Sequence, residues 1–287
     1  MDSFIQQALR DGEKLGLRYT LQIPQVAASG IGSRSGRRAG SSIDFQDYRD
    51  YQPGDDLRFI DWGIYARTDR LTIKLFREEV APHLDLILDG SRSMNLEETT
   101  KGLAVARLAA LLATSAANAQ CTRAVWVSGE GFQRLPNDAL PPSAWEKLEW
   151  ESKRTPEQSF EIMPPKFRRL GVRVLVSDLL WPGEPMQILR RMRDGAAALF
   201  VIQLLARDDA NPPEHGNLRV VDSETGNESE IYIDSSIAKQ YTDNLARLQQ
   251  SWADACRQCG AHMTTLIAED LESSIGELEG IQLLAPA

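Results

Sequence analysis

Residues 84–95 read LDLILDGSRSMN, and this stretch decides the fold class. The run LDLIL is apolar apart from Asp85, which is typical of a strand buried inside a sheet. The run stops at Asp89, and Ser91 and Ser93 follow at a spacing of two. A helix start needs only one such oxygen as its cap. The surplus carboxylate and hydroxyls therefore suggest a functional site where the strand ends.

Strand-like and helical segments alternate through the rest of the chain after Pro82. Further apolar runs are RAVWVS (123–128), VRVLVSD (172–178), AAALFVIQLL (196–205) and MTTLI (263–267). Helical patterns cover 101–120, 184–195 and 235–260; another helix is expected around 143–150, and a β-hairpin around 225–227. Apolar strands separated by helices predict an α/β fold with a doubly wound, mostly parallel, Rossmann-like sheet covered on both faces.

The first part of the chain has a different composition. A short amphipathic helix is expected within residues 1–20, and a Gly/Ser/Arg-rich loop covers 29–42. From Ile43 to Val80 aromatic residues, acids and arginines are densely mixed, with a QPGDD turn and an LTIKLF strand. We predict two domains: an N-terminal, β-rich extension over residues 1–82, packed on an α/β domain over residues 83–287.

Composition and charge exclude several classes of function. The chain has 287 residues and a formal net charge of -9, with 32 Lys and Arg against 41 Asp and Glu, so nucleic acid is not expected as a partner. No apolar run reaches the roughly 18 residues that span a bilayer, and the start lacks a signal-peptide pattern. Three cysteines are too few for a disulfide framework. We expect a cytoplasmic protein with no membrane insertion.

A second acid extends the cluster after Asp89. The run VRVLVSD ends in Asp178, and ligands of doubly wound sheets bind beyond the carboxyl ends of strands, where the strand order reverses. Asp89, Ser91, Ser93 and Asp178 would form an all-oxygen site there. Such a site suits Mg²⁺ or Mn²⁺, with water or a partner's carboxylate completing the shell. The alternative is that Asp89 and the serines only cap the turn and the helix.

Two resemblances refine this hypothesis. DGSRS, Asp89 to Ser93, resembles the D-x-S-x-S of the metal-ion-dependent adhesion site in von Willebrand factor A domains, and SDLL resembles their later strand-end Asp, here Asp178. This resemblance implies that Asp89, Ser91 and Ser93 ligate the ion, with Asp178 binding it directly or through water. The Thr that usually completes such a site has no clear counterpart; Thr155 lies in the right interval, without a recognisable motif around it.

The block before this domain is similar to the family catalogued as domain of unknown function 58. The matching positions are Phe45, Arg49, Tyr51, Gly54, Asp55, Asp56, Arg58, Ile60, Asp61, Trp62, Ala66, Arg67, Lys74, Phe76 and Glu79. The resemblance implies an A-type domain after this block and a chaperone-like or maturation role beside a MoxR-type AAA+ ATPase. Asp55, Asp56, Arg58, Asp61 and Arg67 could form a recognition surface or a catalytic cluster. Structural ion pairs and turn hydrogen bonds that attach the extension to the core are favoured.

Other reactive residues lack a convincing pattern. Cys256 and Cys259 lie on the apolar stripe of a helix near its end, so we expect core thiols. The histidines, His83, His215 and His262, are scattered. The sequence contains neither a G-x-S-x-G nor a Walker A motif. The oxygen cluster and the family resemblance together favour a non-enzymatic, protein-binding module whose Mg²⁺ (or Mn²⁺) site holds an acidic residue of a partner.

Two alternatives remain open. A metal-dependent hydrolase could use the same acids, but it needs a general base, for which only Asp85 and Glu97 lie nearby. A metal-free scaffold is the other alternative.

Overall fold

The computed structural model describes residues 2–23, 43–78, 82–95, 100–146, 148–211, 216–221 and 228–287. The chain forms two compact units. Unit 1 comprises Met1–Pro24 and Pro82–Ala287, and unit 2 comprises Gln25–Ala81. Unit 1 contains the sheet that the apolar runs predict, and unit 2 contains the aromatic and charged block.

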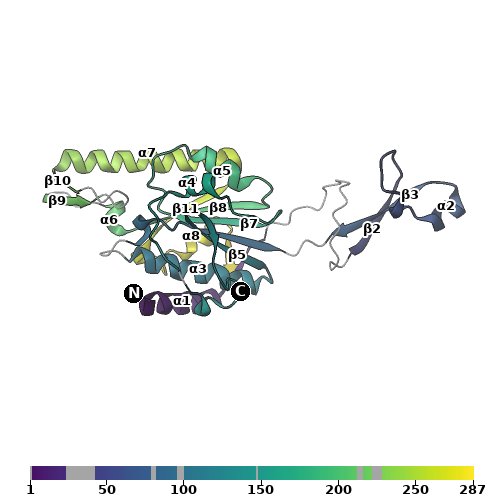
Figure 1. Ribbon diagram of the computed structural model, residues 1–287, viewed down its shortest axis with the longest axis horizontal. Coiled ribbons are helices and arrows are strands. Elements are labelled where there is room, and N and C mark those ends of the chain that lie inside the picture. Colours follow the sequence, from purple (N-terminus) through teal and green to yellow (C-terminus); the bar gives the residue numbers. More distant parts are fainter. Residues whose placement is uncertain are drawn as a thin grey trace. The chain divides into compact units, whose positions relative to one another are not determined.

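Unit 1 is built around a six-stranded sheet in the order β11-β8-β7-β4-β5-β6 (Figure 1). The strands are β4 (His83–Leu88), β5 (Thr122–Gly129), β6 (Gly131–Arg134), β7 (Val172–Ser177), β8 (Ala198–Leu205) and β11 (His262–Ile267). All neighbours are parallel except β6, which runs antiparallel to β5. The chain continues from β4 to β5 on one side and later returns to β7 on the other. The strand order therefore reverses at β4, and the predicted mostly parallel α/β sheet is confirmed.

Helices cover both faces of this sheet (Figure 1). One core cluster contains Leu86 and Leu88 of β4, and the other contains Ile87, so successive residues of this strand point into opposite, buried faces. The first cluster is covered by α1 (Asp2–Gly16), α3 (Lys101–Asn118) and α8 (Ile275–Gly280). The second is covered by α4 (Pro156–Ile162), α5 (Pro185–Arg193) and α7 (Ser235–Cys259).

The N-terminal helix belongs to unit 1, which corrects the predicted domain boundary. Helix α1 buries Ala8 and Leu9 in the same cluster as α3. Gly12 and Gly16 face α3, where a Cβ atom would collide with its backbone. The strand β1 (Tyr19–Leu21) then pairs antiparallel with β12 (Leu284–Pro286). The predicted extension over residues 1–82 is thus divided: its first 24 residues pack with the sheet, and only residues 25–81 form a separate unit.

Unit 2 is a two-stranded hairpin with short helices between its strands. The strands β2 (Ile43–Asp50) and β3 (Thr72–Glu78) pair antiparallel, and η1 (Leu57–Phe59) and α2 (Trp62–Thr68) lie between them. The predicted turn is present: the Asp55 N–H donates to the Gln52 carbonyl at 3.0 Å, and Gly54 has a φ of 105°. Only glycine adopts this angle readily, which explains Gly54 in the turn.

The charged residues of unit 2 bind each other and its backbone. Arg49 holds Asp55 through two hydrogen bonds of 2.7 Å. Asp56 caps η1 and binds Arg58, which lowers the pKa of Asp56 to about 2. Asp61 caps α2, and its Oδ2 lies 3.2 Å from Lys74 Nζ. Arg67 donates from Nε to the Gly63 carbonyl. These contacts are ion pairs and turn hydrogen bonds, as the sequence favoured, and all of them join residues within unit 2.

One predicted helix is wrong. Among its described residues, 143–146 and 148–150, the segment around 143–150 has only a short 3-10 turn, η3 (Pro142–Ala144), and no α-helix. Trp145, Leu148 and Trp150 are all buried, so their apolar spacing reflects core contacts of an irregular segment. The helix of this region is α4, which begins after Thr155.

The remaining elements follow the sequence pattern. The predicted hairpin is formed by β9 (Gly216–Val221) and β10 (Glu228–Ile233), while its expected tip at 225–227 lies outside the described residues. Other short elements are η2 (Arg92–Asn95), α6 (Arg207–Ala210) and η4 (Ala268–Asp270). Across the described ranges we find no helix with the length and apolar character needed to cross a bilayer.

Candidate functional site at the carboxyl edge of the sheet

Asp89 follows the last residue of β4 and is the centre of the predicted oxygen cluster. Its Oδ1 accepts a hydrogen bond from the Ser91 N–H at 2.9 Å and another from the Ser128 hydroxyl at 3.4 Å. Its Oδ2 accepts a hydrogen bond from the Ser177 hydroxyl at 2.6 Å. The Asp89 N–H donates to the Val176 carbonyl at 3.0 Å. Donors from β5, β7 and the following turn thus bind both oxygens of this carboxyl group.

The Asp89 carboxyl group is almost completely buried, with 1% of the residue exposed. Burial raises the pKa of Asp89 to about 6, because the charged form loses its hydration, and the negative charge of Asp178 adds to this rise. Hydrogen bonds from Ser177 and Ser91 oppose the shift. The group is therefore partly protonated near neutral pH, unlike an exposed Asp.

Ser91 and Ser93 lie together on the turn that follows Asp89. Their hydroxyl oxygens are 3.0 Å apart and share a hydrogen bond. Ser91 is buried and Ser93 is half-buried. A second segment closes on this turn: the Arg92 N–H donates to the Ser152 carbonyl, and the Ser152 N–H donates to the Gly90 carbonyl, both at 3.0 Å. The two serines are therefore fixed by backbone pairing.

Asp178 directly follows β7, at the neighbouring strand end. Its Oδ1 accepts a hydrogen bond from the Leu180 N–H at 3.1 Å, and its carbonyl accepts one from the Gln203 side chain at 2.9 Å. Its N–H faces the Met94 sulfur at 3.2 Å. Asp178 is buried, like Asp89. The structure thus brings all four predicted site residues to the carboxyl ends of β4 and β7, as the strand-end argument required.

The sequence analysis missed a buried lysine at this site. Lys101, the first residue of α3, donates from Nζ to Asp178 Oδ2 at 3.0 Å and to Asp209 Oδ2 at 2.8 Å. Only 1% of Lys101 is exposed. Burial alone would lower the pKa of this amine, but the carboxylates of Asp178 and Asp209 outweigh burial and raise the pKa above its usual value. The edge therefore contains a permanent cation.

Asp209 was also missed, although a signal for it exists. It lies in α6, directly after β8, which is the next strand beyond β7. The rule that selected Asp89 and Asp178, an acid just after a buried parallel strand, also selects the ARDD sequence at 206–209. Lys101 has no comparable signal, because a lysine at a helix start is usually solvated.

Thr155 serves as a helix cap. Its hydroxyl accepts a hydrogen bond from the Gln158 N–H at 3.3 Å, and the Gln158 side chain accepts one from the Thr155 N–H at 3.2 Å. Together these contacts form a capping box at the start of α4. This capping role accounts for Thr155, and no role as a metal ligand is needed to explain it.

With Lys101 bound to Asp178 and Asp209, the arrangement of these residues does not fit a magnesium ion. Mg²⁺ requires near-octahedral oxygen ligands with free lone pairs at short distances. Here both Asp89 oxygens accept hydrogen bonds from the chain, the two serine hydroxyls bind each other, and Asp178 Oδ2 binds Lys101. Within the described ranges, no three His, Cys, Asp or Glu side chains are grouped to hold a metal. The cluster as folded is an internally satisfied network with its own cation.

Asp85, one of the two acids considered for a hydrolase, is bound by structural partners. Asp85 accepts hydrogen bonds from the Trp126 indole at 3.0 Å and from the Arg168 N–H at 3.1 Å, so both of its oxygens have structural partners. Glu97 lies outside the described residues. Asp85 is therefore not placed to act as a general base.

The remaining reactive residues have structural surroundings. Cys256 is buried in the second core cluster, where burial and the neighbouring Cys259 raise its pKa to about 12. Cys259 is half-buried against the same cluster. His83 Nδ1 hydrogen-bonds the Thr122 hydroxyl, and the His262 ring stacks on Phe200. The expectation of core thiols thus holds for Cys256, and His215 lies outside the described residues.

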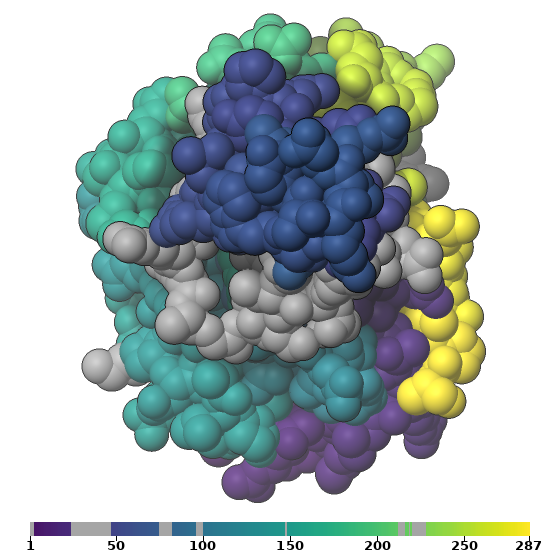
Figure 2. Space-filling view, turned by 90° about the vertical axis from the view of Figure 1, so that its right-hand side faces the viewer, coloured from purple at the N-terminus to yellow at the C-terminus, as the bar shows by residue number. Residues whose placement is uncertain are grey.

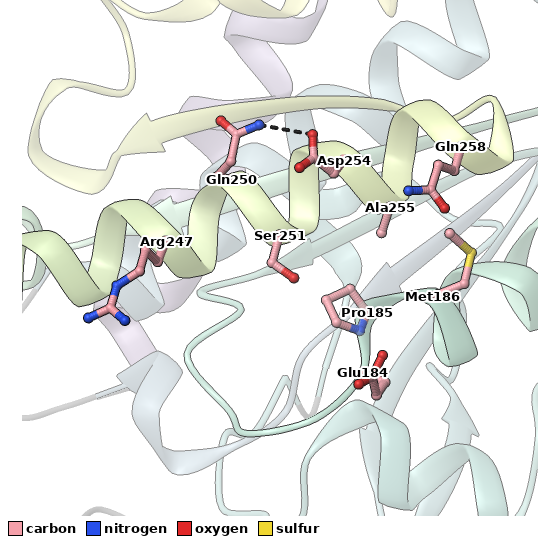
Figure 3. Close-up of a pocket in the computed structure, with 9 residues that line it drawn as sticks. All are labelled: Glu184, Pro185, Met186, Arg247, Gln250, Ser251, Asp254, Ala255 and Gln258. Atoms are coloured by element: carbon pink, nitrogen blue, oxygen red, sulfur yellow. Dashed lines mark hydrogen bonds between the residues drawn. The ribbon is translucent and has the colours of Figure 1, made fainter.

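A shallow hollow of about 450 Å³ lies between the start of α5 and the C-terminal half of α7 (Figure 3). Figure 3 shows Gln250 bound to Asp254 one helical turn away, at 2.9 Å. The charged residues that line the hollow also include Glu184 and Arg247. None of the oxygen-cluster residues lines it, so we do not assign the site to this hollow.

The family of the chain follows from a match over residues 47–251, which runs from unit 2 into α7. The matching family model is described as "Protein of unknown function DUF58". This chain belongs to that family. Two relatives, uncharacterized protein Rv1480 of Mycobacterium tuberculosis and uncharacterized protein Mb1516 of Mycobacterium bovis, are each 26% identical to it over 251 residues. The matched region covers 82% of this DUF58 chain and 78% of each relative.

Two solved structures also resemble this DUF58 chain. BatB from Bacteroides thetaiotaomicron has a TM-score of 0.36 and 10% identity, covering 70% of this chain and 98% of its own. An aerotolerance-related membrane protein from Bacteroides fragilis has a TM-score of 0.35 and 12% identity, covering 70% and 100%. The two mycobacterial relatives are named only as uncharacterized, so their names indicate no particular activity.

Proposed function

We propose that this DUF58 chain is a non-enzymatic, protein-binding module. Its first candidate partner is an AAA+ ATPase of the MoxR type, or a client of that ATPase, in a chaperone-like or maturation role in the cytoplasm. Unit 1 would be of the von Willebrand factor A-like type, because D-x-S-x-S follows β4 and an Asp follows the neighbouring β7.

One observation carries the proposal: unit 2, whose described residues are dark blue in Figure 2, leaves large apolar side chains uncovered by its own residues. Trp62 is 60% exposed and Leu57 is 58% exposed, and Tyr65 and Leu71 are also exposed. Trp62 and Tyr65 meet edge to face at 6.1 Å. Exposed apolar clusters mark protein contacts, and Trp and Tyr dominate the binding energy of many interfaces.

The geometry of the oxygen cluster supports a structural role for this sheet edge better than it supports a catalytic role. Asp89, Ser91, Asp178 and Lys101 are each at most 3% exposed, so their polar atoms face one another. The protein-binding role we propose therefore requires no metal at this edge. Of the alternatives that the sequence leaves open, a metal-free scaffold agrees best with this arrangement.

Binding should depend on the exposed apolar side chains of unit 2. The experiment compares wild type, a Trp62→Ser/Leu57→Ser double variant and a Phe4→Ser control, each immobilised and offered the purified MoxR-type ATPase of the same organism. Phe4 is 68% exposed on α1, which makes it a matched control on unit 1. We expect the double variant to lose at least tenfold in affinity, about 1.4 kcal/mol, with the control unchanged. Equal binding by all three proteins would refute this surface.

The hydrolase alternative has a separate test. Turnover of generic phosphate esters in Mg²⁺, abolished by Asp178→Asn, would favour an enzyme over a binding module. We expect no turnover above the rate of the Asp178→Asn variant.

A further inference from the structure

We propose that the ammonium group of Lys101 takes the place of a divalent ion at this sheet edge. The oxygen atoms around it would bind such an ion if the lysine were absent. Wild-type protein would then bind no divalent ion there. The inference concerns the isolated chain, so it stands or falls independently of the protein partner proposed above.

The two acids that bind Lys101 are also held by other groups of the chain. The Leu180 N–H donates to the Asp178 carboxylate, and the Gln203 side chain donates to the Asp178 backbone carbonyl. Asp209 Oδ2, which binds Lys101, also accepts a hydrogen bond from the Ala206 N–H at 2.9 Å. Fixed carboxylates from the ends of two neighbouring strands thus converge on one nitrogen. This is the geometry expected of a cation site, filled by a side chain.

Helix α7 closes the network from outside. The Tyr241 hydroxyl donates to the Asp209 carbonyl at 2.7 Å. Burial raises the pKa of Tyr241, and Asp209 adds to the rise while Lys101 opposes it, which places the phenol close to both charges. The ion group is therefore enclosed by β7, α3, α6 and α7.

The charge balance shows what removal of Lys101 would create. Asp89, Asp178 and Asp209 lie near one edge of the sheet. Among the described residues, Lys101 is the cation that pairs with Asp178 and Asp209. Without the ammonium group, the buried carboxylate of Asp178 and the half-buried carboxylate of Asp209 would face each other across the space it leaves, with Ser91 and Ser93 on the adjoining turn. Such a set of hard oxygens attracts Mg²⁺ or Mn²⁺.

The test is a Mn²⁺ titration of the full chain, followed by electron paramagnetic resonance, together with thermal melting in Mg²⁺ and in EDTA. We expect wild type and the exposed-lysine control Lys239→Ala to bind no stoichiometric Mn²⁺ and to melt identically in both conditions. Lys101→Ala should bind one Mn²⁺ per chain, and its Tm should rise by about 5 °C in saturating Mg²⁺. A second change, Asp178→Asn, should abolish that binding.

The other possible results also decide the proposal. Stoichiometric Mn²⁺ binding by wild type that Asp89→Asn removes would mean that Lys101 does not replace the ion. A folded Lys101→Ala protein without Mn²⁺ binding would mean that the oxygen set is not competent. If Lys101→Ala is unfolded in EDTA, folding restored by Mg²⁺ supports the proposal, while failure to fold in Mg²⁺ contradicts it.

Discussion

Asp89 shows how a single buried carboxyl group affects the stability of the protein. Its folded pKa is about 6 and its ordinary value is 3.8, so the folded state binds the proton more tightly. The stabilisation from this proton is complete below about pH 4 and is lost as the pH rises through about 6. The negative charge of Asp89 is therefore unfavourable in the folded protein at neutral pH.

We expect Asp89→Asn to stabilise the protein at about pH 8 by up to about 3 kcal/mol, and the gain to vanish near pH 4. An amide oxygen can still accept the Ser91 N–H. The measurement is urea unfolding in EDTA across this pH range, with the exposed Asp243→Asn as control. A loss of stability that is absent near pH 4 and grows as the pH rises above about 6 would show instead that the negative charge of Asp89 is required.

Lys101 can be tested for its structural importance at the same scale. Lys101→Met removes the charge and keeps the length of the side chain, which leaves the buried Asp178 and the half-buried Asp209 without their cation. We expect a loss of about 3–5 kcal/mol in the free energy of unfolding, measured in urea with Lys239→Met as control. A neutral or stabilising effect would mean that the two carboxylates are neutralised in another way.

The residues of the site were predictable only in part. Asp89, Ser91, Ser93 and Asp178 follow from strand-end positions, because the carboxyl ends of parallel strands share one edge. Lys101 could not be predicted, since its burial depends on contacts with two acids 77 and 108 residues further along the chain. Long-range ion pairing of this kind leaves no local pattern.

At the scale of elements, the contact between α1 and α3 depends on glycine. A Cβ atom at Gly12 would lie against the Arg107 carbonyl oxygen and 2.9 Å from Ala110 Cβ. We expect Gly12→Ala to destabilise the protein by about 1–3 kcal/mol, because α1 must move away from α3. The control is Gly276→Ala in α8, where a Cβ atom meets nothing within 4 Å. That change should stabilise by up to about 1 kcal/mol. Chemical unfolding of both variants distinguishes the two effects.

Strands were predicted more reliably than short helices. The runs of β4, β7 and β8 are apolar at nearly every position, because both faces of a central strand are buried. The segment 143–150 shows the weakness of such patterns, since Trp145, Leu148 and Trp150 are buried without forming a helix. Spacing alone does not distinguish a short helix from an irregular segment with buried side chains.

At the scale of the whole molecule, the division into units differs from the composition boundary. The sequence changes character near residue 82, yet α1 and β1 pack with elements more than 80 residues away. Composition identified unit 2 because its aromatic and charged residues are distinctive. It could not assign α1, because an amphipathic helix does not specify the surface that it covers.

This division predicts opposite effects for two deletions. The core clusters of unit 1 draw no member from residues 25–81 within the described ranges, whereas Ala8, Leu9 and Leu21 belong to one of them. Replacing residues 25–81 by a long Gly/Ser linker should therefore preserve cooperative unfolding, since loop length adds little cost. Deleting residues 2–23 should lower the free energy of unfolding by at least about 3 kcal/mol, because it removes buried leucines and the partner of β12.

Urea unfolding followed by circular dichroism measures both deletions, and binding to the ATPase separates stability from function. The linker variant should fold but fail to bind, because it lacks Trp62 and Leu57. Unfolding of the linker variant would contradict the independence of unit 1. Full binding by a folded linker variant would instead locate the partner on unit 1, where exposed side chains such as Phe4 and Tyr232 become the next candidates. The two deletions thus test the architecture and the proposed binding surface with separate readouts.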